Sequence, residues 1–170
     1  MSQVTIVMYH YIRELPQTRY PGIKGLLLSQ FREQLSYLKK FYQFVTLVDC
    51  LRAVTSNDSD FPPNAILLTF DDAYVDHFPN VFPILEENKI QGCFFPPAKP
   101  ILEHKVLAVN KLHFLLASVA NTDSLVKEVY SCLDQHRGEF SLESNDFYFL
   151  KLAKEGRFDP KEIVFIKKLL

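Results

Sequence analysis

The sequence predicts an α/β fold in which a parallel sheet is followed by a helical segment. In the first hundred residues, short apolar runs rich in β-branched and aromatic side chains alternate with stretches of helical spacing. This order of elements is typical of parallel sheets. After Pro100 the helical spacing continues without another strand-like run. We therefore expect strand–helix units in residues 1–100 and a helical segment in residues 101–170.

Four strands are expected in the first part of the chain. Residues 4–9 (VTIVMY) and 65–70 (AILLTF) are apolar with little alternation, which suits strands that are covered on both faces. Residues 92–95 (GCFF) form a third such run and end at Pro96-Pro97. A shorter strand is expected at residues 44–47.

Helices are expected between these strands and after them. Ser29 is a candidate N-cap for a helix with a regular apolar face. A helix starting at Asn80 would hold Pro83 in its first turn, where proline is tolerated. Residues 55–64 are polar and proline-rich, which predicts a surface loop. The remaining helices are expected near residues 48–54, 112–119, 125–133, 146–154 and 160–170.

Composition and charge exclude several classes of protein. The chain has 170 residues, a hydrophobic fraction of 48% and a formal net charge of −1, which fits one globular core and lacks the basic stripe of a nucleic-acid binder. No apolar run reaches the ~18 residues of a membrane span. Residues 1–9 do not resemble a signal peptide, so a cytoplasmic location is expected. The three cysteines match no zinc spacing.

The strongest local signal is residues 68–74 (LTFDDAY), in which two aspartates follow an apolar strand. In parallel α/β folds ligands bind at the carboxyl ends of strands. Neighbouring side chains of an extended segment point to different sides, so one aspartate can reach a cation while the other faces a reacting water. Two close carboxylates also push each other's pKa apart unless a cation lies between them. The alternative is that Asp71 or Asp72 only caps a turn.

The TFDDAY segment resembles the TFDDG-Y motif of the polysaccharide deacetylases, the NodB-homology family (carbohydrate esterase family 4). Further similarities occur in the same order over about residues 1–100. The resemblance implies the first half of a (β/α) barrel, with residues 101–170 as an insertion or as the start of the second half. The similar segments are the MYHYI opening, Phe31-x-x-Gln34-Leu35-x-x-Leu38, residues 80–85 (NVFPIL) and Gly92–Phe95.

The resemblance also implies a chemistry. Asp71 would be the general base, and Asp72 would bind a divalent metal, zinc or similar, together with two histidines of a later H-S/T-x-x-H motif. Such a metal polarises the acetyl carbonyl and lowers the pKa of the attacking water. The substrate would be an N-acetylated or O-acetylated sugar or polysaccharide. Ala73 departs from the family's glycine, and alanine disfavours the left-handed backbone that glycine adopts freely.

The histidine motif does not occur in these 170 residues. No two of the five histidines lie four positions apart, and a catalytic zinc takes about three protein ligands. We expect the motif beyond Leu170, so that this chain is an N-terminal part that binds no metal tightly and is inactive by itself. The alternative is a non-catalytic pseudoenzyme or a carbohydrate-binding or interaction module.

Other residues are candidates for the cleft or for substrate contact. His10 ends the first strand, and Tyr74 and His77 follow Asp72 closely; a structural role for either histidine stays open. Phe94-Phe95 is interpreted as core or as one wall of a sugar groove. The open edge of an unclosed barrel also predicts self-association.

Overall fold

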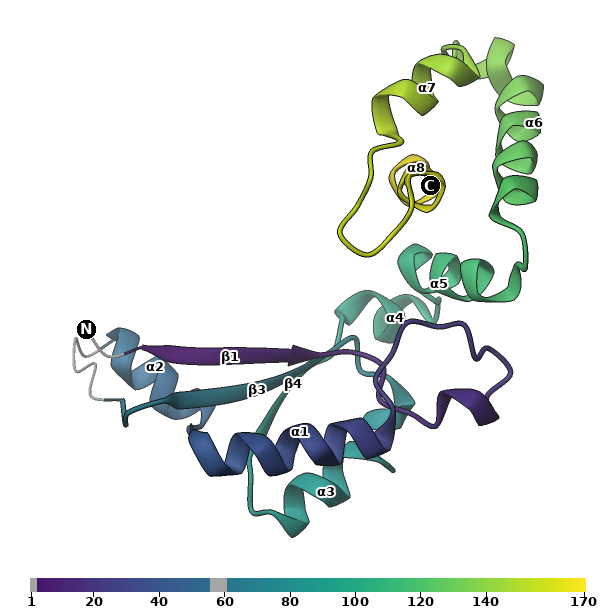
Figure 1. Ribbon diagram of the computed structural model, residues 1–170. Helices are drawn as coiled ribbons and strands as arrows, with labels where there is room; N and C mark the ends of the chain where they lie inside the picture. The colour runs from purple at the N-terminus through teal and green to yellow at the C-terminus, as the bar shows by residue number, and fades with distance from the viewer. Residues whose placement is uncertain (1–2, 56–60) are drawn as a thin grey trace. The chain divides into compact units, whose positions relative to one another are not determined.

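The computed structural model describes residues 3–55 and 61–170, and the chain divides into two compact units (Figure 1). The first unit comprises Met1–Arg19 and Lys24–Lys105, and the second comprises Tyr20–Ile23 and Val106–Leu170. In the described residues all strands belong to the first unit. Its elements are β1 (Val4–Tyr9), η1 (Leu15–Gln17), α1 (Leu28–Phe41), β2 (Gln43–Phe44), α2 (Leu47–Thr55), β3 (Ala65–Asp71), η2 (Val75–His77), α3 (Val81–Glu87), β4 (Gly92–Phe95) and α4 (Ala98–Glu103).

The four strands form a parallel sheet in which β3 pairs with each of the others. β1 runs beside β3 from the Val4–Ala65 pair to the Tyr9–Phe70 pair. β2 pairs with the first two residues of β3, and β4 pairs with its last four. The predicted class, a parallel α/β sheet followed by helices, is therefore confirmed.

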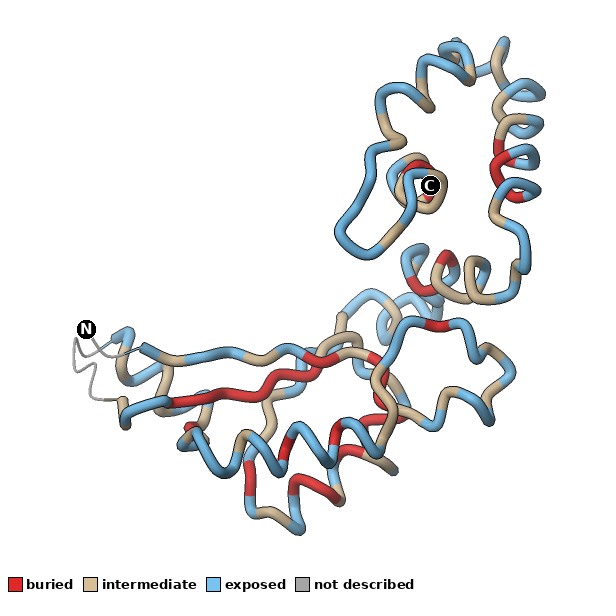
Figure 2. Tube along the Cα trace, in the orientation of Figure 1, coloured by how far each residue is buried: buried red, intermediate tan, exposed pale blue. Residues whose placement is uncertain are grey.

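β3 is the buried centre of the first unit (Figure 2). Because side chains alternate along a strand, Ile66, Leu68 and Phe70 share one face and pack with residues of α1 and α3. Figure 1 shows both helices on the same side of the sheet. Ala65 and Leu67 belong to a smaller cluster that includes Cys50 of α2. Residues 65–70 are therefore apolar without alternation because β3 is covered on both faces, as the sequence predicts.

A close approach explains the glycine that begins β4. A Cβ atom at Gly92 would lie 2.7 Å from both Leu85 Cδ1 and Phe70 Cε2. These side chains are 2% and 0% exposed, so neither has room to move away from an added methyl group. A glycine at this position lets α3 pack tightly against the end of β3.

Several predicted boundaries are wrong by a few residues. Ser29 does not cap α1, because the helix begins at Leu28 and Gln30 Oε1 accepts a hydrogen bond from the Leu27 amide at 3.1 Å. β2 shares only Phe44 with the strand expected at residues 44–47, since Leu47 already begins α2. Of the predicted loop, residues 56–60 lie outside the described residues.

Helix α4 and the two 3₁₀ turns were not predicted. The sequence predicts that Pro96-Pro97 ends a strand, and in the structure Pro97 is also the N-cap residue of α4. Pro100 lies in the first turn of that helix, where its missing N–H has no intrahelical partner to lose. Proline therefore ends one element here and begins the next.

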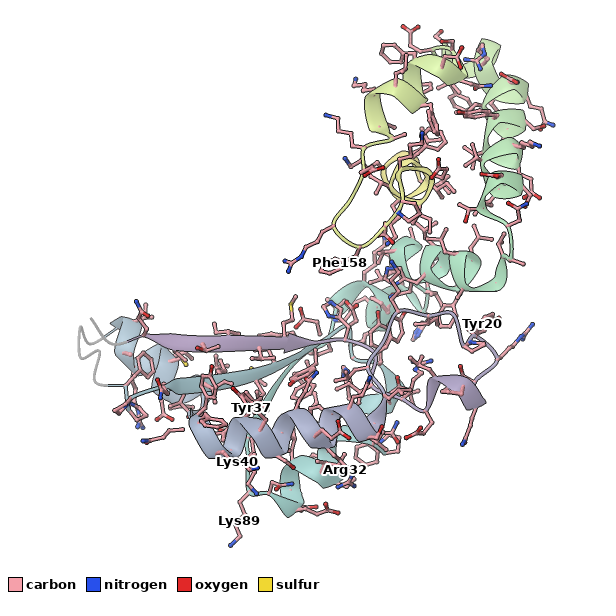
Figure 3. The ribbon with its side chains drawn as sticks, viewed as in Figure 1. Tyr20, Arg32, Tyr37, Lys40, Lys89 and Phe158 are labelled. Carbon is pink, nitrogen blue, oxygen red and sulfur yellow. The ribbon has the colours of Figure 1, made fainter. Side chains whose placement is uncertain are left out.

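Charged side chains cover the solvent side of α1, where Figure 3 labels Arg32 and Lys40. Arg32 forms an ion pair with Glu87 of α3 at 3.3 Å, and both side chains are more than half exposed. Exposed pairs of this kind contribute at most about 1 kcal/mol. The apolar face of α1, with Phe31 and Leu35 buried, accounts for its place on the sheet.

The second unit is helical in the described residues, and the four helices predicted after residue 110 are confirmed. Its core surrounds Phe165 and Ile166, both 0% exposed, and includes Leu112 and Val129. Asn121 and Ser144 cap two of the helices through their side chains. The helices are α5 (Ala108–Ser118), α6 (Thr122–Phe140), α7 (Asn145–Leu152) and α8 (Lys161–Leu169). Within residues 3–55 and 61–170, no helix has the length and apolarity that crossing a bilayer requires.

Candidate functional site

The carboxyl ends of three parallel strands bring the candidate site residues to one edge of the sheet. Asp71 is the last residue of β3 and pairs with Phe95 of β4. His10 directly follows Tyr9, whose partner on β3 is Phe70. His10, Asp71 and Phe95 therefore lie at the same level of neighbouring strands, at the edge where parallel α/β proteins bind their ligands.

Asp71 is half-buried, and its carboxylate forms no hydrogen bond or ion pair with the residues that the structure describes. Its charge acts on Cys93 of β4: burial raises the pKa of the Cys93 thiol, and the negative charge of Asp71 raises it further. Cys93 is therefore a neutral thiol near the carboxylate. Asp71 remains able to accept a proton or a hydrogen bond from an incoming group.

Asp72 leaves the strand conformation and is held by Tyr74. The backbone turns left-handed at Asp72 and Ala73, with φ values of 68° and 49°. The expectation of an extended Asp71–Asp72 pair is thus wrong, and Ala73 adopts the conformation that alanine disfavours, which costs about 1–2 kcal/mol. The Tyr74 hydroxyl donates a hydrogen bond of 2.7 Å to Asp72 Oδ2.

Tyr74 packs on Tyr11, which lies two residues after β1. The two rings stack with centroids 3.8 Å apart and planes inclined by 21°. Burial raises the pKa of the Tyr74 hydroxyl well above its usual range, and hydrogen bonding to Tyr11 and Asp72 raises it further. The hydroxyl therefore stays protonated and remains a hydrogen-bond donor.

Two contacts join the segment after β1 to the segment after β3. Arg13 Nε donates to Asp76 Oδ2 at 2.6 Å, and their side chains are only 17% and 10% exposed. Asn80 Nδ2 donates to the Ile12 carbonyl oxygen at 3.2 Å. A buried carboxylate needs a partner of this kind, because an unpaired charge is costly away from water.

His77 is buried at 5% exposure, and its Nε2 lies 2.8 Å from the carbonyl oxygen of His10. A carbonyl oxygen can only accept, so Nε2 carries the proton and Nδ1 keeps its lone pair in the neutral ring. Nδ1 has no hydrogen-bond partner among the residues that the structure describes, and the rings of Phe70, Phe94 and Tyr74 lie within 6 Å of the imidazole. His77 therefore contacts the main chain of His10, the other histidine that the sequence placed near the cleft.

Phe94 and Phe95 do not lie in the core. They are 38% and 48% exposed, although one face of Phe94 stacks on Phe70 at a centroid distance of 4.9 Å. The core interpretation is therefore wrong for Phe95 and half right for Phe94. Both β4 aromatics are accessible near the end of the strand that pairs with Asp71.

The described residues offer part of a metal site. Asp71 and Asp72 supply carboxylate oxygens, which divalent cations accept as ligands. Among residues 3–55 and 61–170, no group of three or more His, Cys, Asp or Glu side chains could hold a metal ion. His113 and His136 belong to helices of the second unit. These side chains alone therefore do not fit a complete catalytic zinc site, which takes about three protein ligands.

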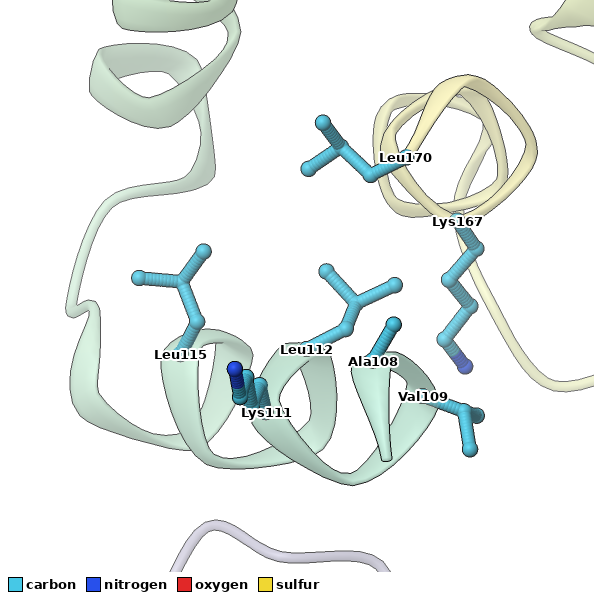
Figure 4. Close-up of a pocket in the computed structure, with 7 residues that line it drawn as sticks. All are labelled: Ala108, Val109, Lys111, Leu112, Leu115, Lys167 and Leu170. Atoms are coloured by element: carbon cyan, nitrogen blue, oxygen red, sulfur yellow. The ribbon is translucent and has the colours of Figure 1, made fainter. Parts of the chain in front are cut away.

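The second unit contains an apolar cavity of about 490 Å³ (Figure 4). Leucines, valine and alanine form most of its wall, and Lys111 and Lys167 supply the charges. Lys167 is paired with Asp159 at 2.7 Å. The cavity wall contains no carboxylate or histidine that could act as a base. The candidate catalytic side chains are therefore the aspartates of the first unit. The lining residues are Ala108, Val109, Lys111, Leu112, Leu115, Lys167 and Leu170.

Fold and site together define a parallel α/β protein with two carboxylates at the carboxyl end of its central strand. The family model described as "Polysaccharide deacetylase" matches residues 58–136. This match confirms the resemblance drawn from the sequence: residues 58–136 are similar to the polysaccharide deacetylase family. The match contains Asp71, Asp72 and Tyr74, extends into α6, and does not include the MYHYI opening.

Three solved structures of deacetylases are similar to the chain. A de-N-acetylase from Aggregatibacter actinomycetemcomitans is 21% identical, with 55% of this chain and 37% of that chain covered and a TM-score of 0.46. IcaB from Ammonifex degensii is 29% identical, with 56% and 39% covered and a TM-score of 0.44. The Streptococcus pyogenes deacetylase PplD, in complex with acetate, is 17% identical, with 98% and 80% covered and a TM-score of 0.47. The chain thus spans well under half the length of the first two, and no curated protein sequence matches it.

Proposed function

We propose that this chain carries part of the active site of a carbohydrate deacetylase, a hydrolase that removes acetyl groups from a sugar or polysaccharide. Asp71 is the general base and Asp72 is a ligand of a divalent metal. The observation that carries this proposal is the position of the two carboxylates at the carboxyl end of the central strand, where Asp71 is the last residue of β3 and Asp72 follows it. The family match over residues 58–136 supports the choice of reaction.

The free carboxylate of Asp71 suits the role of base. In hydrolysis of an acetamide, water oxygen bonds to the acetyl carbon, the carbon–nitrogen bond breaks, and the nitrogen leaves with a proton as an amine. Asp71 would accept the proton that the attacking water loses, and this kind of help contributes ~10²–10⁴-fold to a rate. No described residue competes for that carboxylate by a hydrogen bond or an ion pair.

Asp72 suits the role of a ligand that is held in place. Its Oδ2 accepts the Tyr74 hydroxyl at 2.7 Å, which leaves the other oxygen for a cation. When bound, a divalent metal such as zinc supplies a Lewis acid for the acetyl oxygen. In this proposal the further ligands are histidines from outside the 170 residues. Candidates for substrate contact are His10, Tyr74 and the exposed Phe95, since aromatic rings can stack on sugar rings.

The same proposal includes two further points: the sheet belongs to an unclosed (β/α) barrel, and copies of the chain associate through the open edge of this sheet. Ile6 and Met8 of β1 are each 59% exposed, and in the described residues β1 pairs only with β3. Exposed apolar side chains on an edge strand favour association. A sedimentation coefficient that rises with concentration in the 170-residue chain would support this part of the proposal.

The experiment uses the full product of the gene and measures acetate released from N-acetylglucosamine oligosaccharides, together with bound metal. Asp71→Asn should keep the metal and lower turnover by ~10²–10⁴-fold. Asp72→Asn should lose metal and activity together, because it removes an anionic ligand. Asp123→Asn, an exposed residue in the first turn of α6, is the matched control and should change neither quantity.

Equal loss of stability in Asp71→Asn and Asp72→Asn, with turnover per folded molecule unchanged, would show that these residues only cap a turn. The DNA that follows the codon for Leu170 separates the two classes of function. An H-S/T-x-x-H motif there supports the enzyme, whereas a product without it favours a non-catalytic carbohydrate-binding protein. The 170-residue chain alone should release no acetate in the same assay with added zinc.

A further inference from the structure

We infer that two exposed phenylalanines, Phe78 and Phe82, form an aromatic platform on which sugar units of a polysaccharide chain stack. The platform follows the two aspartates in the chain and extends the candidate site beyond them. The inference rests on the proposed function, because it names a sugar polymer as the ligand. It assigns the platform a neutral oligosaccharide of N-acetylhexosamine units, whose binding there needs no cation.

The two phenylalanines lie on one face of a helical stretch. The Asn80 amide donates to the Asp76 carbonyl oxygen at 3.0 Å, the pairing of an α-helix, and Phe78 and Asn80 both have right-handed helical backbone angles. Residues four positions apart in such a stretch share a face. Accordingly, the Phe78 and Phe82 rings are neighbours, with centroids 6.2 Å apart and planes inclined by only 16°.

This face is apolar where a surface helix normally presents polar residues. Helices of globular proteins turn charged side chains to solvent, as α3 does further along with the exposed Glu86 and Glu87. By contrast, Phe78 is 78% exposed, Phe82 is 46% exposed, and the nearby Val75 is 78% exposed. Along residues 75–87 the exposed apolar side chains thus lie toward the aspartates. Exposed apolar groups that gather in one place mark a surface for a binding partner.

Buried contacts on the inward side hold the platform in place. Asp76 and His77, the two residues before Phe78, are both buried. The Asp76 carboxylate is paired with Arg13 at 2.6 Å, and His77 Nε2 donates to the His10 carbonyl oxygen at 2.8 Å. Both contacts join the segment to residues that follow β1. A surface that is ordered before its ligand arrives loses less conformational entropy on binding.

The chemistry of the platform favours a sugar. The face of an aromatic ring carries partial negative charge, which attracts the C–H groups on the flat side of a pyranose ring. Phosphate-bearing ligands need basic side chains, and the exposed residues at positions 75, 78, 79 and 82 include none. A neutral ligand with flat rings fits this surface. The deacetylase family match over residues 58–136 contains the platform and supports a carbohydrate.

The test uses the 170-residue chain and the pentasaccharide of N-acetylglucosamine, without added metal. NMR shifts of the amide signals of residues 75–82 report binding, including weak binding. Phe78→Ala should raise the Kd by about 2–10-fold, the range expected for losing one stacking contact. Phe78→Tyr keeps an aromatic ring and should bind as the unsubstituted chain does, whereas Phe78→Leu should bind as Phe78→Ala does. Phe140→Ala, at an exposed phenylalanine of α6, is the matched control and should leave the Kd unchanged.

The full product of the gene gives a second measurement. Phe78→Ala should raise the KM for acetate release from the pentasaccharide by a similar factor and should change kcat less. The reason is that the phenylalanines have no group that could act on the acetyl bond, so they contribute to binding and not to the chemical step.

The outcomes separate this inference from the proposed function. If Phe78→Ala and Phe82→Ala bind the pentasaccharide as the unsubstituted chain does, the platform is refuted and the roles of Asp71 and Asp72 are untouched. If Phe78→Leu binds as tightly as Phe78→Tyr, stacking is refuted. If the full product releases no acetate but the chain binds the pentasaccharide through Phe78, the proposed function fails and the platform stands. A Phe78→Ala chain that self-associates less but binds sugar equally well would show that the surface contacts a second copy, which also overturns the inference.

Discussion

Replacing Ala73 with glycine should stabilise the protein, although the same change usually weakens a fold. Ala73 is exposed and has φ 49°. A left-handed conformation costs a residue with a Cβ about 1–2 kcal/mol, and glycine is free of this penalty. The strain at this position is therefore the quantity that Ala73→Gly removes.

The expected gain follows from two opposing contributions. Glycine makes the unfolded chain more flexible, which lowers stability by about 0.4–1 kcal/mol. Subtracting this from the relief of strain leaves a net gain of about 0.5–1 kcal/mol. No packing is lost, because the Ala73 methyl group lies on an exposed residue.

Urea unfolding followed by circular dichroism measures the change, and Ala53→Gly provides the matched control. Ala53 lies inside α2, where glycine should lower the free energy of unfolding by about 1 kcal/mol. Opposite signs for the two substitutions would support the analysis of the turn. If Ala73→Gly lowers stability as Ala53→Gly does, the left-handed strain at Ala73 does not exist and the reasoning is refuted.

Two further substitutions test a buried ion pair in the first unit and the apolar core of the second unit. Arg13→Ala leaves the buried carboxylate of Asp76 without its partner and should lower the free energy of unfolding by about 3–5 kcal/mol, whereas Arg32→Ala, at an exposed ion pair, should change it by less than about 1 kcal/mol. An equal effect of the two arginine variants in urea unfolding would contradict the importance of the buried pair. Phe165→Ala in the core of the second unit, where the side chain is 0% exposed, should cost about 3–5 kcal/mol. Phe140→Ala, at 62% exposure, should be nearly neutral, and thermal unfolding that does not distinguish them would rule out the described core.

The sequence by itself determined the class of fold and the place of the carboxylates. Residues 65–70 are apolar without alternation, which predicts a strand covered on both faces, and β3 is buried from Ala65 to Phe70. For residues 4–9 the same expectation is wrong, because Ile6 and Met8 of β1 are each 59% exposed. Spacing alone predicted the helices of the second unit, because apolar residues that recur every three to four positions are typical of a helix with one apolar face. Asp71 and Asp72 follow a strand whose carboxyl end is defined by the parallel arrangement. Local patterns were sufficient for these features.

Only the tertiary structure decided how the site is held together. The left-handed turn at Asp72 and Ala73 contradicts local preference and persists because the segments around it are fixed by distant contacts. Arg13 and Asp76 are 63 positions apart in the sequence, and His77 and the His10 carbonyl are 67 apart. No periodicity or propensity encodes such pairs, because they arise when parallel strands bring the loops after β1 and β3 to the same edge. The strength of these hydrogen bonds and ion pairs depends on how deeply their atoms are buried. The position of one side chain in the sequence does not specify that burial.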